Sequence, residues 1–301
     1  EKESLKAFHT SGFLGSEFSP FFLVEPDQAV EAVKPPDGMS DTRFAKRYSE
    51  YKKLLANSPI QQHGSEHQKE SLLKSIDNAH RLLSSPKARK AFDLSLESKE
   101  SYDTYKVGVR FGLGCLLAKR LTEAGARFIE VTHGYYPFKY WDTHDNGHTK
   151  MKDLKKMIDA PIAQLVLDLE KSKLLDRTLI VVASEFSRDM MMEGKPEKRV
   201  KDQVQVPPRI DGPQHYGMHR HFTGAGSVLL FGGGIKKGFV YGETADERPC
   251  TTIKNPINTQ QLHATMYRAL GIPHDHHYNV EQRPFYVTPD GVTEPVMDLF
   301  G

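Results

Sequence analysis

The chain has 301 residues, of which 38% are apolar and 27% are charged, and its formal net charge is +2. This composition indicates a globular protein that is long enough to bury a sizeable core. The near-neutral charge gives no reason to expect nucleic acid or an anionic membrane as a partner, and no apolar run approaches the ~18 residues needed to span a bilayer.

Helices dominate the expected structure of the first 125 residues. Residues 1–40 contain many Pro, Gly and Phe without a sustained period and indicate an irregular arm. Residues 41–98 predict a helical hairpin, mostly facing solvent, that Pro86 breaks or restarts. The run "GVRFGLGCLLAKRLTEAG" then predicts an amphipathic helix ended by Gly125.

Strands and helices alternate in the rest of the chain. The expected elements are a strand at 127–131, a helix at 149–173 that Pro161 should kink, a strand at 178–183, a strand, glycine turn and short strand in 226–242, and a helix in 257–272. The apolar run at 178–183 suits a strand buried on both faces. This order predicts an α/β fold, a parallel-type sheet flanked by helices, in which the long helix is a right-handed crossover.

Cysteine and histidine usage indicates which metal ligands are available. Cys115 and Cys250 are the only cysteines, so a Cys-rich zinc site and a disulfide scaffold are both excluded. The fourteen histidines instead cluster. The clusters are His133, His144 and His148; His215, His219 and His221; and His263, His274, His276 and His277. The ligands of any metal are therefore His nitrogen and carboxylate oxygen.

Two polar segments follow the expected strands. "THGYYPFKYWDTHDNGH" leaves the strand at 127–131, and "SEFSRDMM" leaves the strand at 178–183. Because ligands of open parallel sheets bind at the carboxyl ends of the strands, both segments are expected at one edge. Asp142, His144, Asp145 and His148 carry suitable donor atoms, and His133 is expected to orient the loop. The alternative is a polar turn in which Asp142 caps the following helix.

Several stretches resemble the DUF1501 family, exported bacterial proteins related to sulfatases and the alkaline phosphatase superfamily. They are "GFLGSEFSPFFL", "AFDLS", "CLLAKRLTEAGARFIEVTHG", "WDTH", "SEFSR", "SVLLFGGGIKKGFVYGETAD" and "LHATMYRALGI". The resemblance runs from about Gly12 to the C-terminus. It implies two nearby divalent metals, zinc first with Mn, Ca or Mg as alternatives, which activate a nucleophile and bind phosphate or sulfate oxygens.

The same resemblance assigns roles to individual residues. Metal coordination is implied for Asp142, His144, His148, Glu185 and His221. His219 is the alternative to His221, and the alternative for Glu185 is an ion pair with Arg188. Arg188 is implied to bind the anionic group of the substrate.

The family's N-terminal metal-binding segment, which supplies the first Asp and the nucleophile, is not found before Gly12. We therefore expect residues 1–301 to be the C-terminal portion of one sulfatase-like α/β domain, with 41–98 as a helical insertion and no identifiable nucleophile. The missing segment is expected from a longer product or from a partner chain.

Two functions follow from these expectations. The first is a metal-dependent hydrolase of sulfate or phosphate esters, incomplete in this chain, with a small-molecule or polysaccharide ester as substrate. The second is a degenerate, non-catalytic exported protein with a structural or carbohydrate-binding role. Either protein is expected in the periplasm or outside the cell. No signal peptide stands at the start of the sequence, so if the protein is exported, its signal is expected to have been removed already.

Overall fold

The computed structural model describes residues 10–134, 140–143, 147–188, 221–246, 250–280 and 282–301. The chain separates into two compact units. The first comprises Glu1–Asp103, Leu116–Ile129 and Tyr278–Pro284, and the second comprises Thr104–Cys115, Glu130–His277 and Phe285–Gly301. None of the described helices is both long enough and apolar enough to cross a membrane.

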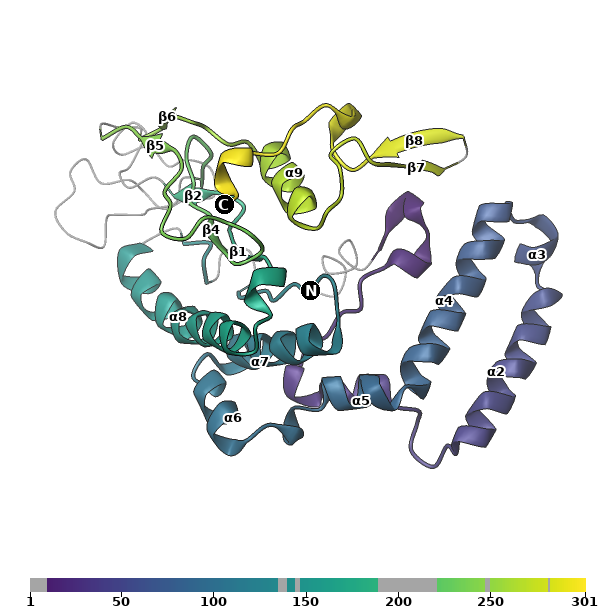
Figure 1. Cartoon of the computed structure of the whole chain (residues 1–301). Helices are drawn as coiled ribbons and strands as arrows, with labels where there is room; N and C mark the ends of the chain where they lie inside the picture. The colour runs from purple at the N-terminus through teal and green to yellow at the C-terminus, as the bar shows by residue number, and fades with distance from the viewer. Residues whose placement is uncertain (1–9, 135–139, 144–146, 189–220, 247–249, 281) are drawn as a thin grey trace, which may run out of the picture. The chain divides into compact units, whose positions relative to one another are not determined.

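Helices and helical turns make up most of the described part of the first unit, which also includes the segment Tyr278–Pro284 (Figure 1). They are η2 (Gly12–Leu14), η3 (Ser16–Phe18), η4 (Pro26–Val33), α2 (Asp41–Ala56), α3 (Pro59–His63), α4 (Glu66–Ser84), α5 (Pro86–Phe92) and η5 (Leu94–Leu96). Helices α6 (Lys99–Lys106) and α7 (Val109–Ala124) contribute residues to both units. Ser65 and Gln68 form a capping box that begins α4, and Pro86 begins α5 as its first residue.

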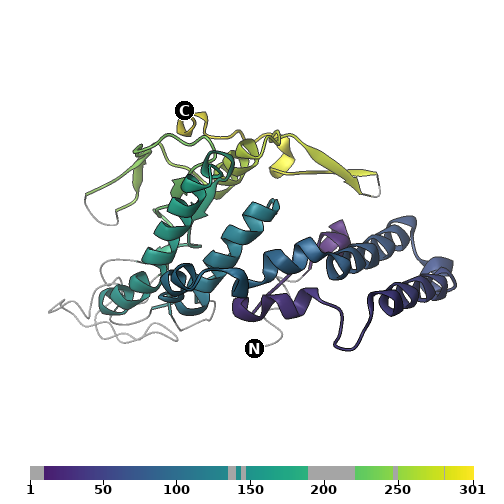
Figure 2. The same ribbon diagram turned by 60° about the horizontal axis from the view of Figure 1, so that its bottom comes forward.

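Helices α2 and α4 lie side by side as an antiparallel pair (Figures 1 and 2). The ring of His80 on α4 stacks on Tyr48 of α2, with 3.8 Å between the ring centroids, and the Tyr48 hydroxyl donates to Asp77. Leu55 and Ser71 are the only residues of these two helices that are buried. The pair is therefore mostly exposed, as its many Lys and Glu residues require.

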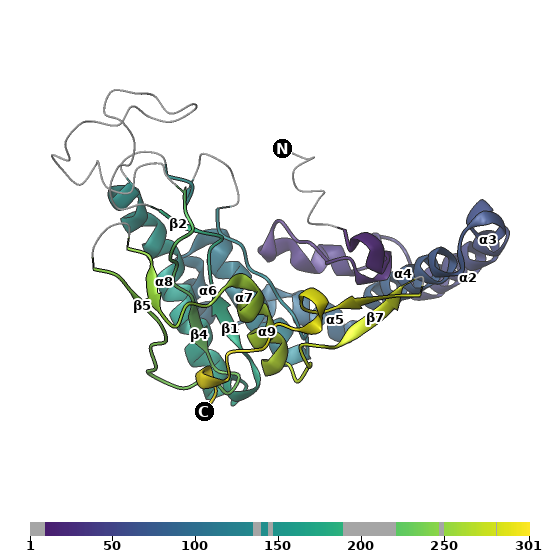
Figure 3. The same cartoon turned by 90° about the horizontal axis from the view of Figure 1, so that it is seen from above.

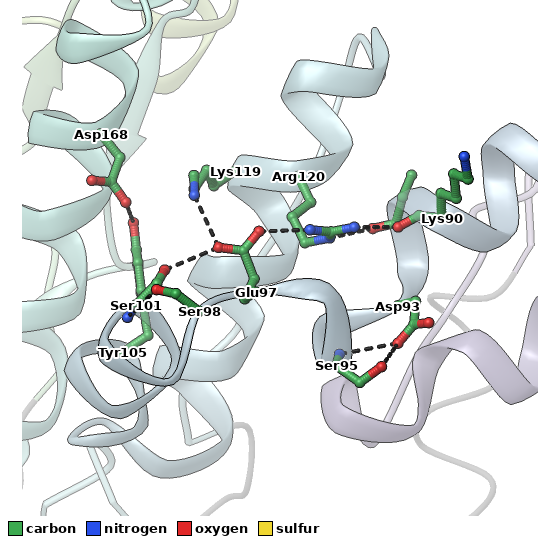
Figure 4. A network of polar contacts seen from close by, with 11 residues as sticks. Lys90, Asp93, Ser95, Glu97, Ser98, Ser101, Tyr105, Lys119, Arg120 and Asp168 are labelled. Atoms are coloured by element: carbon green, nitrogen blue, oxygen red, sulfur yellow. Dashed lines mark hydrogen bonds and ion pairs between the residues drawn. The ribbon is translucent and has the colours of Figure 1, made fainter.

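The core of the first unit forms where η4, α5 and η5 pack together. Its buried apolar side chains include Ala29, Val33, Ala91, Leu94, Leu116 and Leu117. Beside them the Glu97 carboxylate accepts from Lys119 at 3.2 Å and from Arg120 at 2.6 Å (Figure 4). Arg120 also donates to the carbonyl of Ala91, so this partly buried ion cluster ties α7 to the end of α5.

The second unit contains the long helix α8 and strands β1 to β6, and it shares β7 and β8 with the first unit. Its elements are α8 (Gly147–Lys171), η6 (Leu175–Arg177), β1 (Ile180–Val182), β2 (Ser187–Arg188), β3 (His221–Phe222), β4 (Leu229–Phe231), β5 (Glu243–Thr244), β6 (Thr252–Lys254), α9 (Thr259–Ala269), β7 (His277–Val280), β8 (Arg283–Tyr286), η8 (Pro289–Gly291) and η9 (Met297–Leu299). Asn258 caps α9 by accepting from the amide of Gln261.

Helix α8 continues through Pro161, whose ring is fully buried. A Cβ atom on Gly108 would stand 2.6 Å from Cγ of Pro161, so the start of α7 approaches α8 closely at this point. Tyr105, which is also fully buried, donates from its hydroxyl to Asp168 of α8 at 2.8 Å. The turn between α6 and α7 is thus held against α8 by backbone proximity and by a partly buried hydrogen bond.

The described strands form four two-stranded sheets. β1 pairs antiparallel with β4, with Ile180 opposite Phe231, and the two lie side by side in Figure 3. β2 pairs antiparallel with β3, with Arg188 opposite His221. Both ladders join the same two chain segments, 180–188 and 221–231, which run alongside each other as the arms of one long hairpin.

The expected parallel-type sheet flanked by helices is wrong. Residues 127–131 form no strand, and β1 pairs with β4 in the antiparallel sense. Phe128 is 73% exposed, so the segment between Arg127 and Val131 does not bury the apolar side chains that suggested a core strand. The expected strand–helix–strand unit therefore lacks its first strand. Because β1 and β4 are antiparallel, no helical crossover is needed to connect them.

Candidate functional site

The candidate site lies where the β2–β3 ladder meets the loop that contains Trp141, Asp142 and Thr143. Oδ1 of Asp142 stands 3.3 Å from Nε2 of His221, although the two residues are 79 positions apart. The Asp142 side chain is 21% exposed and that of His221 is 49% exposed. The site therefore combines a mostly covered carboxylate with an imidazole that solvent or a ligand can reach.

A tight turn presents Asp142. The amide of Thr143 donates to the carbonyl of Trp141 at 2.9 Å, which makes Asp142 the central residue of a three-residue turn. Thr143 is 4% exposed and so anchors one end of the turn. The indole of Trp141 anchors the other end, because its Nε1–H donates to Nδ1 of His133 at 2.7 Å.

The strand ladder and an aromatic ring present His221. Ser187 stands opposite Phe222 in the ladder, and the Ser187 hydroxyl donates to the Phe222 carbonyl at 3.1 Å. The ring of Phe186 stacks on the His221 imidazole, with 4.0 Å between centroids and 21° between planes. The backbone register and the stack together fix the position and the plane of the imidazole.

The His133 ring is partly buried among other aromatic rings. Phe111, Tyr140 and Trp141 lie around it in edge-to-face arrangements, with centroids 5.4, 6.2 and 5.7 Å away. This burial holds the pKa of His133 below its ordinary value. An indole nitrogen can only donate, so Nδ1 of His133 is the acceptor and carries no proton while this hydrogen bond exists.

A family model described as "Protein of unknown function (DUF1501)" matches residues 1–299. The chain belongs to the DUF1501 family. This confirms the family to which the sequence motifs point, and the model's description assigns no activity. No curated protein and no solved structure matches the chain.

The structure of this DUF1501 chain brings together two of the five expected ligands, Asp142 and His221. Glu185 is exposed at a bend just before Phe186. His144, Asp145 and His219 lie outside the described residues. His148 is in the first turn of α8, but its side chain is not described. Arg188 stands opposite His221 in the β2–β3 ladder.

The donor set of this DUF1501 site suits a divalent cation. Two ligands of one tetrahedral zinc, each about 2.0–2.2 Å from the ion, stand about 3.4 Å apart, close to the Asp142–His221 separation. Carboxylate oxygen and imidazole nitrogen are both ordinary zinc ligands. Over the described ranges, no third His, Cys, Asp or Glu joins the pair in a group able to hold a metal.

Sequence reasoning missed two contacts of the site. Phe186 carries no donor atom and was not among the expected site residues, yet its ring stacks on His221. The bond between Trp141 and His133 was also not foreseen. The available signal was the position of the only tryptophan of the chain, directly before Asp142 and eight residues after a histidine.

Proposed function

We propose that this chain is a divalent-metal-dependent hydrolase of sulfate or phosphate esters, with its metal site built on Asp142 and His221. The observation that carries the proposal is the 3.3 Å approach of Oδ1 of Asp142 to Nε2 of His221. Both residues were expected as ligands from separate sequence motifs. Their meeting across 79 residues is not a consequence of local chain geometry.

The proposal rests on the chemistry of the site and not on the fold. The resemblance to sulfatases motivates the substrate class, an ester of sulfuric or phosphoric acid. The proposal does not depend on a parallel sheet, because the antiparallel β2–β3 ladder presents His221. The loop that contains Asp142 then brings its carboxylate to this histidine.

Each residue of the site has a distinct role in this proposal. Asp142 and His221 hold the cation, and Phe186 keeps the imidazole plane fixed against it. Such a cation supplies Lewis acidity, which activates water for attack and neutralises charge on the ester oxygens. Arg188, the register partner of His221, binds the sulfate or phosphate group through charge-assisted hydrogen bonds.

The first experiment measures binding of zinc and of manganese by isothermal titration calorimetry. Wild-type chain is expected to bind one of them, and Asp142→Asn and His221→Gln are expected to weaken binding by about 100-fold or more, since loss of even a group that orients a ligand costs about 10–100-fold. Asp153→Asn and His263→Gln are matched controls, because both side chains are exposed on helices of the same unit. They should bind metal as the wild-type chain does.

The second experiment assays aryl phosphate and aryl sulfate hydrolysis with and without the bound metal. Metal-dependent turnover that is lost in Asp142→Asn and kept in Asp153→Asn supports the hydrolase. Arg188→Lys should raise KM more than it lowers kcat, because Lys keeps the charge and loses the bidentate geometry. Metal binding without turnover of either ester would favour the non-catalytic alternative, a structural or carbohydrate-binding protein.

A further inference from the structure

We infer that His133 is a positioning residue for the Asp142–His221 pair: its Nδ1 holds the indole of Trp141 and thereby fixes the turn from which Asp142 reaches His221. This inference rests on the proposed function, because it concerns the same metal site. It assigns no contact with metal or substrate to His133 itself.

His133 and Trp141, the two ends of the loop, lie close together. His133 and Trp141 are joined by a 2.7 Å hydrogen bond across eight positions. Next to this bond, Gly134 has φ +73°, and a Cβ at Gly134 would stand 2.7 Å from Cβ of Tyr140 and 3.0 Å from the Trp141 ring. The two ends of the loop are therefore in close contact, and a side chain at position 134 would force them apart.

Trp141 is directly connected to the site through the backbone. Trp141 is the first residue of the three-residue turn whose centre is Asp142. Moving the indole moves the Trp141 backbone, and the Thr143 amide bonded to that backbone has to follow. The Asp142 carboxylate would then leave the position that places Oδ1 3.3 Å from Nε2 of His221.

The rings around His133 fix the plane of its imidazole, since Phe111 and Tyr140 both lie edge-to-face with it. Within that plane, the hydrogen bond from Trp141 selects the ring flip that turns Nδ1 toward the indole. A hydrogen bond acceptor at this one atom is what the indole requires. Asparagine offers an oxygen close to the place of Nδ1, whereas phenylalanine offers the ring without an acceptor.

The test compares His133→Asn, His133→Phe and Trp141→Phe with the wild-type chain by zinc titration. Loss of a group that orients a ligand costs about 10–100-fold in affinity, so His133→Phe and Trp141→Phe are expected to bind zinc at least about tenfold more weakly. His133→Asn should stay within about threefold of wild type. His80→Phe, which removes a stacked histidine from the other unit, is the control for loss of one imidazole.

Folding and positioning are separated by two further readouts. Circular dichroism shows whether each variant is folded. Emission of Trp141, the only tryptophan, should change in His133→Phe and return toward wild type in His133→Asn. Folded His133→Phe with wild-type zinc affinity would overturn the inference, as would His133→Asn that binds as weakly as His133→Phe.

A wild-type chain that binds neither zinc nor manganese would contradict the proposed function and leave the inference testable. In that case the side-chain 15N spectrum of His221 is compared between variants, with His221→Gln used for assignment. His221 signals that shift in His133→Phe and Trp141→Phe but not in His133→Asn support the positioning role. Unshifted signals in all three variants overturn it.

Discussion

At the scale of single residues, surroundings decide the chemistry of the titratable side chains more than residue type does. His133 and His221 are both imidazoles near the same loop. The first is enclosed by aromatic rings and accepts from Trp141, whereas the second faces a carboxylate and is half exposed. Cys115 and Cys250 form a second contrasting pair, since Cys115 is 2% exposed and Cys250 is only partly covered.

Acidification should break the hydrogen bond between His133 and Trp141 only at a pH below the ordinary pKa of histidine. Burial holds the pKa of His133 below about 6.5, and protonation places a hydrogen on the nitrogen that accepts from the indole. Emission of Trp141 is therefore expected to stay constant from about pH 8 to about pH 6.5 and to change below that. Stability should fall over the same acidic range, because the unfolded chain binds the proton first.

The control for this titration is His133→Asn, which accepts from the indole and has no proton to gain in this range. Its emission should not change with pH. A wild-type transition above about pH 6.5, or one that persists in His133→Asn, would contradict this explanation of the Trp141 environment.

The two thiols should differ in reactivity. Burial raises the pKa of the Cys115 thiol to about 12, so it is neither ionised nor accessible at neutral pH. We expect Ellman's reagent to label a single thiol, that of Cys250, in the native chain and both thiols in urea. Rapid labelling of two thiols without denaturant would show that the core around Cys115 opens readily.

At the scale of elements, close backbone approaches and partly buried charges hold the helices together. Gly112 of α7 leaves no room for a side chain, since a Cβ there would overlap the carbonyl of Tyr105 and stand 3.3 Å from the Pro161 ring. In the other unit, Glu97 joins Lys119 and Arg120 where all three side chains are largely covered. Both contacts join residues that no local sequence pattern would pair.

Substituting Gly112 by Ala tests the close approach to α8. Helix propensity favours Ala by about 1 kcal/mol, but overpacking costs more, and we expect a net loss of about 1–3 kcal/mol in the free energy of unfolding. Gly226→Ala is the matched control, because nothing lies within 4 Å of its added Cβ. Chemical denaturation measures both variants, and a Gly112→Ala chain more stable than wild type would rule out the packing described.

Removing the Glu97 carboxylate should cost about 3 kcal/mol, because Lys119 and Arg120 would remain covered without their partner. Asp153→Ala, which breaks an exposed ion pair with Lys156, should change stability by less than about 1 kcal/mol. Equal losses in the two variants would show that the Glu97 cluster is no stronger than a surface pair.

The Glu97 contribution should also depend on pH. Burial raises the pKa of this carboxyl, but hydrogen bonds from Arg120, Lys119 and Ser101 outweigh burial and leave the pKa below its ordinary value. The stabilisation is therefore fully present above about pH 4.5 and is lost as the pH falls through the lowered pKa. Urea titrations of wild type and Glu97→Ala should converge at acidic pH, and a constant gap would contradict this.

At the scale of the whole molecule, the sequence predicted helices and motifs better than it predicted strand pairing. The periodicity and caps of 41–98 and of 149–173 are local, and helices occupy both stretches. The pairing of Ile180 with Phe231 is set by chain segments about 50 residues apart, so the alternation of elements alone could not distinguish it from a parallel partner.

The candidate site shows the same division between local and distant information. The donor types at Asp142 and His221 could be chosen from the sequence because they are properties of single residues. Their partners Phe186 and Trp141 could not, because a stacked ring and an indole hydrogen bond depend on where distant backbone segments meet.

The central claim is that Asp142 and His221 hold one divalent cation, and anomalous diffraction at the zinc edge from crystals soaked in zinc tests it most directly. We expect an anomalous peak within about 2.2 Å of both Oδ1 of Asp142 and Nε2 of His221. The peak should be absent from Asp142→Asn crystals treated in the same way. A zinc peak that touches neither residue, or an Asp142–His221 pair left in direct contact beside zinc bound elsewhere, would contradict the claim.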